Sequence, residues 1–375
     1  MATTNSFIDY HKIVQFLEDQ RVDNTQEVIT EISNNVRSII SKHKKKNSKK
    51  DEIYLSARPL KSVFPNLDLS ILPDWLKDNS NEIRVLGENT LIIPDGRKYQ
   101  LNNNLNDLHG GAWTYFTSSV LNTNYKTSGV DNFAYDIRKI HPSPKPPQLM
   151  RDIIEFFTKK NEIVLDYFMG VGGSLLGASL CSRRSIGIDL NNLYIETYKN
   201  AAKKLGLSTG YTLCGDSLSI LEEATALKNI LHDEKVSLVL IDPPYANMMS
   251  KKKTGADIAV YGNEATPFTN DERDLGNLTQ KDFFEKLKHS VEMSLKFLKK
   301  RGYIVIFIKD MQPHKKETNL LHAEIIKRIN EIENIQYKGL KIWADQTSKL
   351  FPYGYPFSFV ANQIHQYILI FRKES

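Results

Sequence analysis

The chain has 375 residues, of which 41% are hydrophobic and 25% are charged, and its formal net charge is +6. Because it holds only 19 glycines and 14 prolines, it is neither collagen-like nor of low complexity. Its length predicts about two domains, with enough chain to bury a core without disulfides. The modest positive charge permits a polyanionic partner but does not require one.

Nothing in the sequence indicates a membrane or a secreted protein. No stretch approaches the ~18 consecutive apolar residues of a membrane span. Residues 1–12 lack the basic and then apolar run of a signal peptide. Cys181 and Cys214 lie in no zinc-type Cys/His spacing, so we expect no bound metal and a reducing compartment. These features predict a soluble, cytoplasmic protein without a membrane partner.

The first 110 residues are expected to form a separate module. Apolar residues recur at helical spacing over 7–17 and again over 28–40, which predicts two amphipathic helices. Residues 41–50 include six lysines, and this run is either a solvated connector or a strip that contacts phosphate groups. A hairpin is expected within 86–101. We therefore predict a smaller, N-terminal helical module over residues 1–110.

Residues 111–375 alternate short apolar strands with helical stretches. The expected strands cover 162–166, 185–189, 211–216, 236–242 and 302–310. The expected helices cover 146–160, 173–183, 191–205, 217–230 and 279–300. This alternation predicts a doubly wound, mostly parallel sheet that is covered on both faces. The last two strands, 339–344 and 365–373, are joined by a connection too short for a helical crossover, so we expect an antiparallel C-terminal hairpin.

A glycine-rich loop follows the first of these strands. Its residues, DYFMGVGGS over 166–174, let the backbone turn tightly and approach a ligand closely. The dinucleotide fingerprint requires a third glycine where this chain has Leu175, and no Gly-Lys-Ser/Thr phosphate loop follows. A nucleoside ligand without phosphates is therefore expected.

The second and third strands each end near an aspartate. Asp189, about twenty residues beyond the glycine loop, can accept both ribose hydroxyls of a nucleoside, or it can cap the following helix. Asp216 can accept the exocyclic amine of an adenine ring, or it can cap helix 217–230. The glycine loop favours the ligand role in both cases, and the capping role stays open.

The tetrapeptide Asp242-Pro243-Pro244-Tyr245 follows an apolar strand and is the strongest signal in the chain. Two successive prolines rigidify the backbone and remove two N–H donors, which leaves the Asp242 carboxylate and the Pro243 carbonyl as acceptors. Acceptors for both protons of an exocyclic amine localise the lone pair on its nitrogen and direct it at an electrophile. Tyr245 can provide a face on which a planar base stacks.

Together these motifs resemble those of the amino-methylating DNA methyltransferases, which transfer a methyl group from S-adenosylmethionine to adenine N6 or cytosine N4. The segment 141–149, HPSPKPPQL, is similar to the HP-x-x-KP element of that family. The resemblance covers residues 111–375 and implies the class I S-adenosylmethionine-dependent methyltransferase fold. It implies a target-base site made of Asp242, Pro243, Pro244 and Tyr245. It implies cofactor contacts from Ser143, Lys145, Asp166, Phe168, Gly170, Gly172, Ser174, Asp189 and Asp216.

The resemblance implies a site-specific DNA methyltransferase that acts on adenine N6, because Asp-Pro-Pro-Tyr is commoner in the adenine enzymes. A cytosine-N4 enzyme and an RNA base-amine methyltransferase remain alternatives, because they share this pocket chemistry. Methylation at cytosine C5 is excluded, because neither cysteine follows a proline. A protein-glutamine methyltransferase would favour Asn at position 242, and a catalytically silent DNA-binding subunit would have eroded motifs.

The implied partner is double-stranded DNA with its target base flipped out of the helix. A cognate restriction endonuclease or specificity partner is compatible with a bacterial or phage-encoded protein at the nucleoid. The segment 246–277 is expected to be a substrate loop whose lysines at 251–253 touch phosphate. Residues 351–363 form either a hydrophobic rim or a wall of the target-base pocket. Recognition of the DNA site could come from residues 1–110, from the substrate loop or from another protein.

Overall fold

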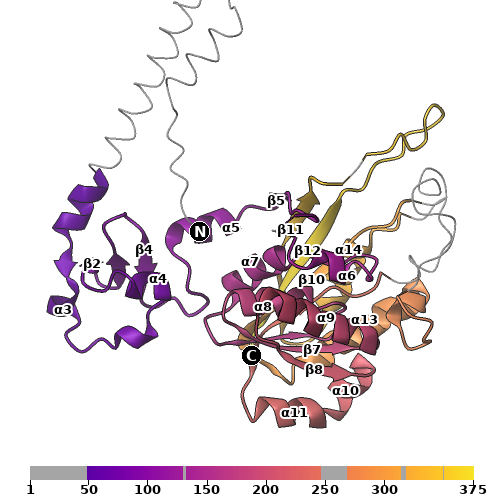
Figure 1. Ribbon diagram of the computed structural model, residues 1–375, viewed down its shortest axis with the longest axis horizontal. Coiled ribbons are helices and arrows are strands. Elements are labelled where there is room, and N and C mark those ends of the chain that lie inside the picture. The colour runs from indigo at the N-terminus through magenta and orange to yellow at the C-terminus, as the bar shows by residue number, and fades with distance from the viewer. Residues whose placement is uncertain (1–48, 130–131, 246–267, 314–317, 349) are drawn as a thin grey trace, which may run out of the picture. The chain divides into compact units, whose positions relative to one another are not determined.

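The computed structural model describes residues 49–129, 132–245, 268–313, 318–348 and 350–375 (Figure 1). The contacts divide the chain into two units, Met1–Asn102 and Asn103–Ser375. In the described residues, no helix is long and apolar enough to cross a membrane. The helices expected at 7–17 and 28–40, and most of the lysine-rich run, lie outside the described residues.

The boundary between the units lies at residue 102 rather than near 110, because the chain immediately after it is anchored in the second unit. The buried side chain of Asn106 donates a hydrogen bond to the backbone carbonyl of Phe156 at 2.7 Å. Asp107 forms an ion pair with Arg183 at 3.1 Å. Both contacts attach residues that sequence analysis had assigned to the N-terminal module.

The described part of the first unit is a small antiparallel sheet with short helices. Its strands, in their order across the sheet, are β1 (Arg58–Pro59), β2 (Arg84–Leu86), β3 (Thr90–Ile92) and β4 (Lys98–Gln100). Its helices are α3 (Leu60–Val63), the 3-10 helix η1 (Leu69–Ile71) and α4 (Asp74–Lys77). The hairpin expected within 86–101 is confirmed by the antiparallel pairing of β3 with β4. In these described residues, Val85 and Leu91 on strands share a core with Leu76 on α4.

The second unit is built on an eight-stranded sheet. Its strands are β5 (Val120–Thr123), β6 (Ile163–Asp166), β7 (Arg184–Asp189), β8 (Tyr211–Cys214), β9 (Val236–Ile241), β10 (Leu298–Ile308), β11 (Ile335–Asp345) and β12 (His365–Lys373). Across the sheet their order is β5-β11-β12-β10-β9-β6-β7-β8. Only β12 runs antiparallel to its neighbours, β10 and β11. This topology confirms the expected class I methyltransferase fold with its antiparallel hairpin.

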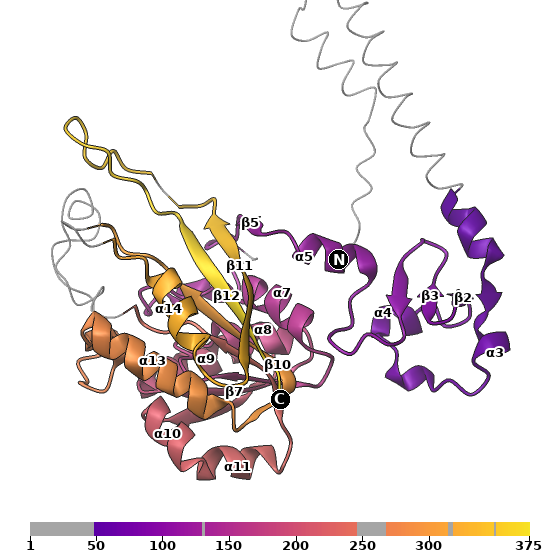
Figure 2. The same ribbon diagram turned by 180° about the vertical axis from the view of Figure 1, so that it is seen from behind.

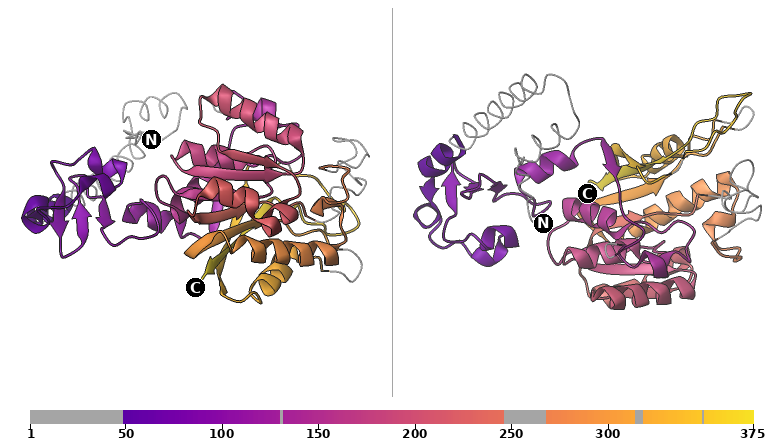
Figure 3. Two further views of the ribbon diagram at one scale, coloured as in Figure 1. Left: turned by 90° about the horizontal axis from the view of Figure 1, so that it is seen from below. Right: turned by 45° about the horizontal axis from the view of Figure 1, so that its top comes forward.

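Helices cover both faces of this sheet (Figure 3). They are α5 (Gly110–Phe116), α6 (Tyr135–Arg138), α7 (Pro147–Phe157), α8 (Gly173–Leu180), α9 (Asn192–Leu205), α10 (Ser217–Glu223), α11 (Thr225–Leu231), the 3-10 helix η3 (Leu275–Asn277), α13 (Gln280–Ser294) and α14 (Leu321–Ile329). On β6, Ile163 and Leu165 pack with α10, α11, α13 and α14, whereas Val164 packs with α7. Successive side chains of a strand point to opposite faces of the sheet, and helices bury both faces.

Three features of this unit were not predicted. The helix expected over 217–230 is broken into α10 and α11, because Ala224 adopts a left-handed conformation at φ 61°. Strand β5 extends the sheet beside β11, although its four residues VLNT are too short to show a pattern. Helix α14 provides the crossover from β10 to β11.

The order of the strands determines where a ligand can bind. Strand β6 lies between β7 and β9, and it is parallel to both. From β6 the chain adds β7 and β8 on one side of the sheet, and then β9 and β10 on the other side. At such a reversal the connections diverge to opposite faces, and a crevice opens at the carboxyl ends of the strands. The glycine loop, Asp189, Asp216 and the tetrapeptide lie at the ends of strands that meet at this edge.

Candidate active site

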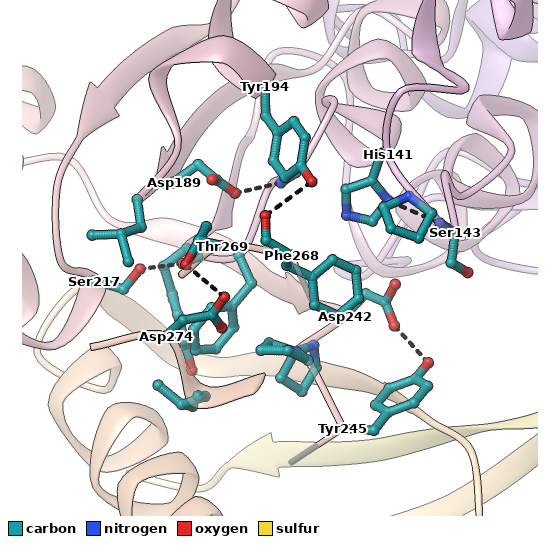
Figure 4. Close-up of a pocket in the computed structure, with 18 of the residues that line it drawn as sticks. His141, Ser143, Asp189, Tyr194, Ser217, Asp242, Tyr245, Phe268, Thr269 and Asp274 are labelled. Atoms are coloured by element: carbon teal, nitrogen blue, oxygen red, sulfur yellow. Dashed lines mark hydrogen bonds between the residues drawn. The ribbon is translucent and has the colours of Figure 1, made fainter. Parts of the chain in front are cut away.

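A pocket of about 460 Å³ lies at the carboxyl ends of the central strands (Figure 4). This volume falls in the range of small-molecule sites, which is about 300–1,000 Å³. Its lining consists of His141, Pro142, Ser143, Tyr167, Phe168, Gly170, Asp189, Leu190, Tyr194, Asp216, Ser217, Asp242, Pro243, Pro244, Tyr245, Phe268, Thr269, Arg273, Asp274, Leu275, Lys309 and Gln366.

The structure brings most of the expected site residues to this pocket. Those on its lining are Ser143, Phe168, Gly170, Asp189, Asp216, Asp242, Pro243, Pro244 and Tyr245. Four others do not line it: Lys145, Asp166, Gly172 and Ser174. Of these four, Lys145 and Asp166 form hydrogen bonds with residues of the lining, Asp242 and Phe168.

Asp166 stabilises the glycine loop and is not part of the pocket lining. Its carboxylate accepts hydrogen bonds from the Ser174 hydroxyl and, at 3.0 Å, from the Phe168 N–H. Burial raises the pKa of Asp166 to about 7, although both hydrogen bonds oppose the shift. Asp166 and Ser174 thus join the first and last residues of the loop, and their expected contact with the cofactor stays a prediction.

Gly172 is required by the turn that begins α8. Its φ is +72°, and a Cβ there would overlap the ring of Tyr198. We expect Gly172→Ala to lower the free energy of unfolding by about 2–3 kcal/mol, from backbone strain and displacement of that ring. Gly206→Ala is the matched control, because its φ is +65° and no atom lies within 4 Å of the added carbon. Urea unfolding should show a loss of only about 1 kcal/mol for the control, and equal losses would refute the steric role of Gly172.

Asp189 connects the second strand to the glycine loop. Its carboxylate accepts hydrogen bonds from the N–H groups of Gly170 and Asn191, both at 2.8 Å. Asn191, not Asp189, caps α9, because its side chain accepts from the Leu193 N–H. The capping alternative for Asp189 is thus taken by its neighbour. Burial raises the pKa of Asp189 to about 6.

Asp216 caps α10 and also lines the pocket. Its carboxylate accepts from the N–H of Leu218 at 3.3 Å and from the hydroxyl of Ser219 at 2.8 Å. The capping role that the sequence left open is therefore present. Because each carboxylate oxygen has two lone pairs, capping does not prevent Asp216 from accepting a ligand proton.

Asp242 has a donor on each of its carboxylate oxygens. Its Oδ2 forms an ion pair with Lys145, and its Oδ1 accepts the Tyr245 hydroxyl proton at 2.8 Å (Figure 4). The Lys145 side chain is only 6% exposed, against 18% for Asp242, and its ammonium lies 5.4 Å from the ring centre of Phe307. Lys145 therefore orients Asp242 and is not part of the pocket lining, and its expected contact with the cofactor stays a prediction.

Tyr245 acts first as a hydrogen-bond donor. Burial and the charge of Asp242 raise the pKa of its hydroxyl well above the ordinary value, so it keeps its proton. The same hydroxyl lies 3.4 Å from Oε1 of Gln366 on β12. The ring of Tyr245, on which a base is expected to stack, is therefore held in place by the hydrogen bonds of its hydroxyl group.

His141, the first residue of the HP-x-x-KP element, forms an uncharged wall of the pocket. Its ring stacks on Phe268 with centroids 5.0 Å apart, and its Nδ1 accepts from the Ser143 N–H at 3.2 Å. Burial, with Lys145 and Arg138 nearby, lowers its pKa to about 3. A neutral imidazole at this position provides a flat apolar surface.

Sequence analysis did not single out several residues of the lining. Tyr194 projects from α9, and its hydroxyl donates to the Phe268 carbonyl at 3.2 Å. Phe268, Thr269, Arg273, Asp274 and Leu275 belong to the described end of the expected substrate loop, which does border the pocket. The lysines at 251–253 lie outside the described residues. Only the loop's position after the tetrapeptide could have indicated these residues.

The C-terminal loop is not a wall of this pocket. None of residues 351–363 belongs to the lining, and Gln366 at the start of β12 takes that place. The loop instead projects beyond the sheet as a yellow hairpin (Figures 1 and 2). The loop therefore does not line this pocket, and its expected place beside the target base stays a prediction.

The lining is rich in carboxylates, which favours a ligand with positive charge and several hydrogen-bond donors. They are Asp189, Asp216, Asp242 and Asp274, alongside the cations Arg273 and Lys309. Glycine backbone, aromatic rings and carboxylates at neighbouring strand ends together fit a nucleoside that carries an amino-acid chain. Within the described ranges, no group of three or more His, Cys, Asp or Glu side chains could hold a metal ion.

Comparison with known proteins agrees with this geometry. The DNA methylase family N6_N4_Mtase matches residues 3–200 of the chain. The tRNA (guanine(10)-N2)-dimethyltransferase of Methanocaldococcus jannaschii is 29% identical over 144 residues, which are 37% of this chain and 39% of that protein. The type II methyltransferase M.HindIII of Haemophilus influenzae is 40% identical over 67 residues, which are 18% of this chain and 21% of that protein. The chain thus spans well under half of either relative.

Among solved structures, TrmN from Thermus thermophilus aligns with 60% of this chain and 48% of its own, at 14% identity and a TM-score of 0.36. The family match is of a different kind, because it spans more than half of the chain and includes the glycine loop and Asp189. The chain belongs to the N6/N4 DNA methylase family.

Proposed function

We propose that this chain transfers the methyl group of S-adenosylmethionine to the exocyclic N6 of adenine in double-stranded DNA. The observation that carries the proposal is the Asp242 carboxylate at the end of β9. It is held by Lys145 and by the hydroxyl of Tyr245, and Figure 4 shows the bond to Tyr245. An oriented acceptor beside a rigid Pro-Pro backbone is suited to an amine that must lose a proton. The match to a DNA methylase family supports DNA as the substrate class.

The cofactor is proposed to lie between the glycine loop and the aspartates of β7 and β8. Gly170 and Ser143 would border its methionine end, Asp189 would accept its ribose hydroxyls, and Asp216 its adenine amine. When bound, S-adenosylmethionine supplies a methyl group that is already activated by the sulfonium. The protein therefore has to align the reacting groups rather than create a nucleophile.

The residues of the tetrapeptide perform that alignment. Asp242 and the Pro243 carbonyl accept the two protons of the target amine, which keeps the lone pair of its nitrogen available. Each Asp242 oxygen holds one donor and retains a second lone pair for the substrate. When the amine nitrogen accepts the methyl group, the bond between that methyl and the sulfonium sulfur would break and S-adenosylhomocysteine would leave. Asp242 would stabilise the positive charge on the amine and accept its proton, which then passes to solvent. His141 and Phe268 provide apolar walls that limit the access of water.

An RNA base amine is the second candidate substrate. The relative from Methanocaldococcus jannaschii is a tRNA guanine-N2 enzyme, and its similarity covers more of this chain than that of M.HindIII. An exocyclic amine on guanine presents the same two protons to Asp242. The pocket lining alone favours neither nucleic acid, whereas the family match favours DNA.

Transfer of labelled methyl groups distinguishes these substrates. The full chain is incubated with labelled S-adenosylmethionine and with unmethylated duplex DNA or total RNA, and the products are digested to nucleosides. We expect N6-methyladenine from DNA, and none with Asp242→Ala. N4-methylcytosine would overturn the choice of base, and label only in RNA would overturn the choice of nucleic acid.

Cofactor affinity is expected to fall on acidification through pH 6. Asp189, with a pKa of about 6, is mostly ionised at pH 7 and mostly protonated at pH 5, and a protonated carboxyl cannot accept both ribose hydroxyls. The Kd of S-adenosylhomocysteine, measured by calorimetry, should therefore rise roughly tenfold between pH 7 and pH 5. Asp189→Asn should bind weakly without this pH step. The same step in that variant would assign the titration to another group, such as Asp274, whose pKa burial also raises.

A further inference from the structure

Three aromatic side chains stand almost entirely in solvent on the loop between β11 and β12. Tyr355 is 81% exposed, Phe357 is 92% exposed and Phe359 is 93% exposed. They are the most exposed large hydrophobic side chains in the part of the chain that the structure describes. Single exposed apolar residues are ordinary, but a group of three on one projecting loop indicates a binding surface. We call residues 351–362 the aromatic finger.

The aromatic finger has a fixed neck. The N–H of Phe351 donates to Oδ1 of Asn362, and Nδ2 of Asn362 donates back to the Phe351 carbonyl, both at 2.8 Å. Gln312, which follows β10, donates its side-chain amide to the carbonyl of Ala361 at 2.6 Å. These bonds join the two ends of the finger to each other and to the segment that follows β10.

The tip of the finger is a compact turn. The Gly354 carbonyl accepts from the N–H groups of Phe357 at 2.7 Å and Ser358 at 2.8 Å. The φ of Gly354 is +76°, and a Cβ there would overlap the Ser358 carbonyl. These backbone groups are thus paired within the tip, and the side chains of Tyr355, Phe357 and Phe359 are exposed to solvent.

The chemistry of the finger favours bases over phosphates. Residues 351–362 contain no charged side chain, although the whole chain carries a net charge of +6. Contacts with phosphate groups depend on lysine and arginine, whereas uncharged rings stack on the flat faces of bases. Apolar side chains that enter a base stack unstack the step and kink the duplex.

The finger is rooted at the target-base side of the pocket. It continues through residues 363 and 364 into β12, where Gln366 lines the pocket 3.4 Å from the Tyr245 hydroxyl. Its neck is bonded to Gln312, three residues after the pocket residue Lys309. Figures 1 and 2 show the finger projecting from this end of the sheet. A nucleotide held by Asp242 would therefore leave its neighbours in the strand near the finger.

We propose that the aromatic finger inserts a ring into the DNA base stack and fills the gap that the extruded target base leaves. The inference rests on the proposed function, because only a duplex substrate requires a base to be extruded. It assigns base extrusion to a segment that contributes nothing to the pocket lining. The finger then lowers the cost of unstacking and leaves the transfer step to Asp242.

The test compares substrates that differ in how easily the target base is extruded. Once sequencing has located the methylated base, one duplex carries the fully paired site and a second carries a mismatch at that base. In the full chain, the triple variant Tyr355→Ala, Phe357→Ala, Phe359→Ala should methylate the paired duplex at least tenfold more slowly. On the mismatched duplex it should stay within threefold of the wild type, because a mismatched base is extruded more cheaply.

Two further variants serve as controls. Tyr211→Ala removes an aromatic side chain that is 63% exposed on β8, at the other edge of the sheet, and should leave both rates unchanged. Phe357→Trp should keep the rate on the paired duplex, and its added fluorescence should be quenched when that duplex binds. Thermal unfolding of the triple variant should match the wild type, since the three rings are exposed.

Every other outcome counts against the inference. Full activity of the triple variant on the paired duplex would overturn it and would assign the finger to a protein partner. An equal loss on both duplexes would give the finger a general binding role instead. If the wild type methylates RNA but not DNA, the proposed function itself is overturned. The activity of the wild type on DNA and RNA is therefore measured before any variant is compared.

Discussion

Replacing Asp242 with alanine is expected to lower the turnover of methyl transfer by at least about 10²–10³-fold. The reason is that the Asp242 carboxylate is the one side-chain acceptor of the tetrapeptide, and its two oxygens are already oriented by Lys145 and Tyr245. Cofactor affinity should change by less than threefold, because the proposed cofactor contacts lie at β6, β7 and β8. Single-turnover transfer to duplex DNA and calorimetry with S-adenosylhomocysteine measure the two quantities.

The matched control for this prediction removes a carboxylate elsewhere. Glu196→Ala breaks only an exposed ion pair with Lys199 on α9 and should leave both measurements unchanged. Retention of transfer in Asp242→Ala would show that the tetrapeptide is not the catalytic element. A large loss of cofactor affinity in the same variant would place Asp242 in the cofactor site instead.

Replacing Lys145 with methionine is expected to lower turnover by about 10²-fold. The substitution keeps the apolar stem but removes the only ion-pair partner that the structure shows for the Asp242 carboxylate. Breaking a largely buried charge pair by removing one partner costs about 2–5 kcal/mol. Without Lys145, Asp242 is held less firmly in the orientation that the transfer step needs. We therefore expect turnover to fall rather than cofactor affinity.

A double-mutant cycle tests whether Lys145 acts through Asp242. If it does, adding Lys145→Met to Asp242→Ala should cause no further loss, because the group that Lys145 orients is already absent. Losses that multiply would contradict the link between the two residues. A rise in the cofactor Kd of Lys145→Met alone would restore the role that the family resemblance implied. Lys145→Arg, which keeps the charge, should recover part of the turnover.

Local patterns in the sequence were sufficient to predict the catalytic unit. Apolar runs of strand length alternate with helical periods, and a parallel sheet follows because such strands must be buried on both faces. The antiparallel end followed from the short connection before β12. Since parallel strands carry their following loops to one edge, Gly170, Asp189, Asp216 and Asp242 could be expected to lie together, and all four line one pocket.

The N-terminal unit shows where such patterns fail. Strands of two or three residues, such as β1 and β2, are too short to display an alternation, so only the hairpin of β3 with β4 was expected in its described sheet. The same limit concealed β5, which joins the large sheet only through its pairing with β11. Elements of this length are decided by the neighbours they pair with, and not by their own composition.

Tertiary packing alone decided which motif residues line the pocket. Asp166 and Lys145 belong to motifs next to the pocket, yet one is buried beneath the glycine loop and the other is paired with Asp242, 97 positions away. No spacing rule encodes such a contact, because side-chain direction in a loop depends on the space that distant elements leave. The aromatic loop after β11 is the clearest example: its composition suggested a pocket wall, but the strands that carry it direct its rings into solvent. The sequence determined the chemistry present at this edge of the sheet, and packing determined which groups are free to use it.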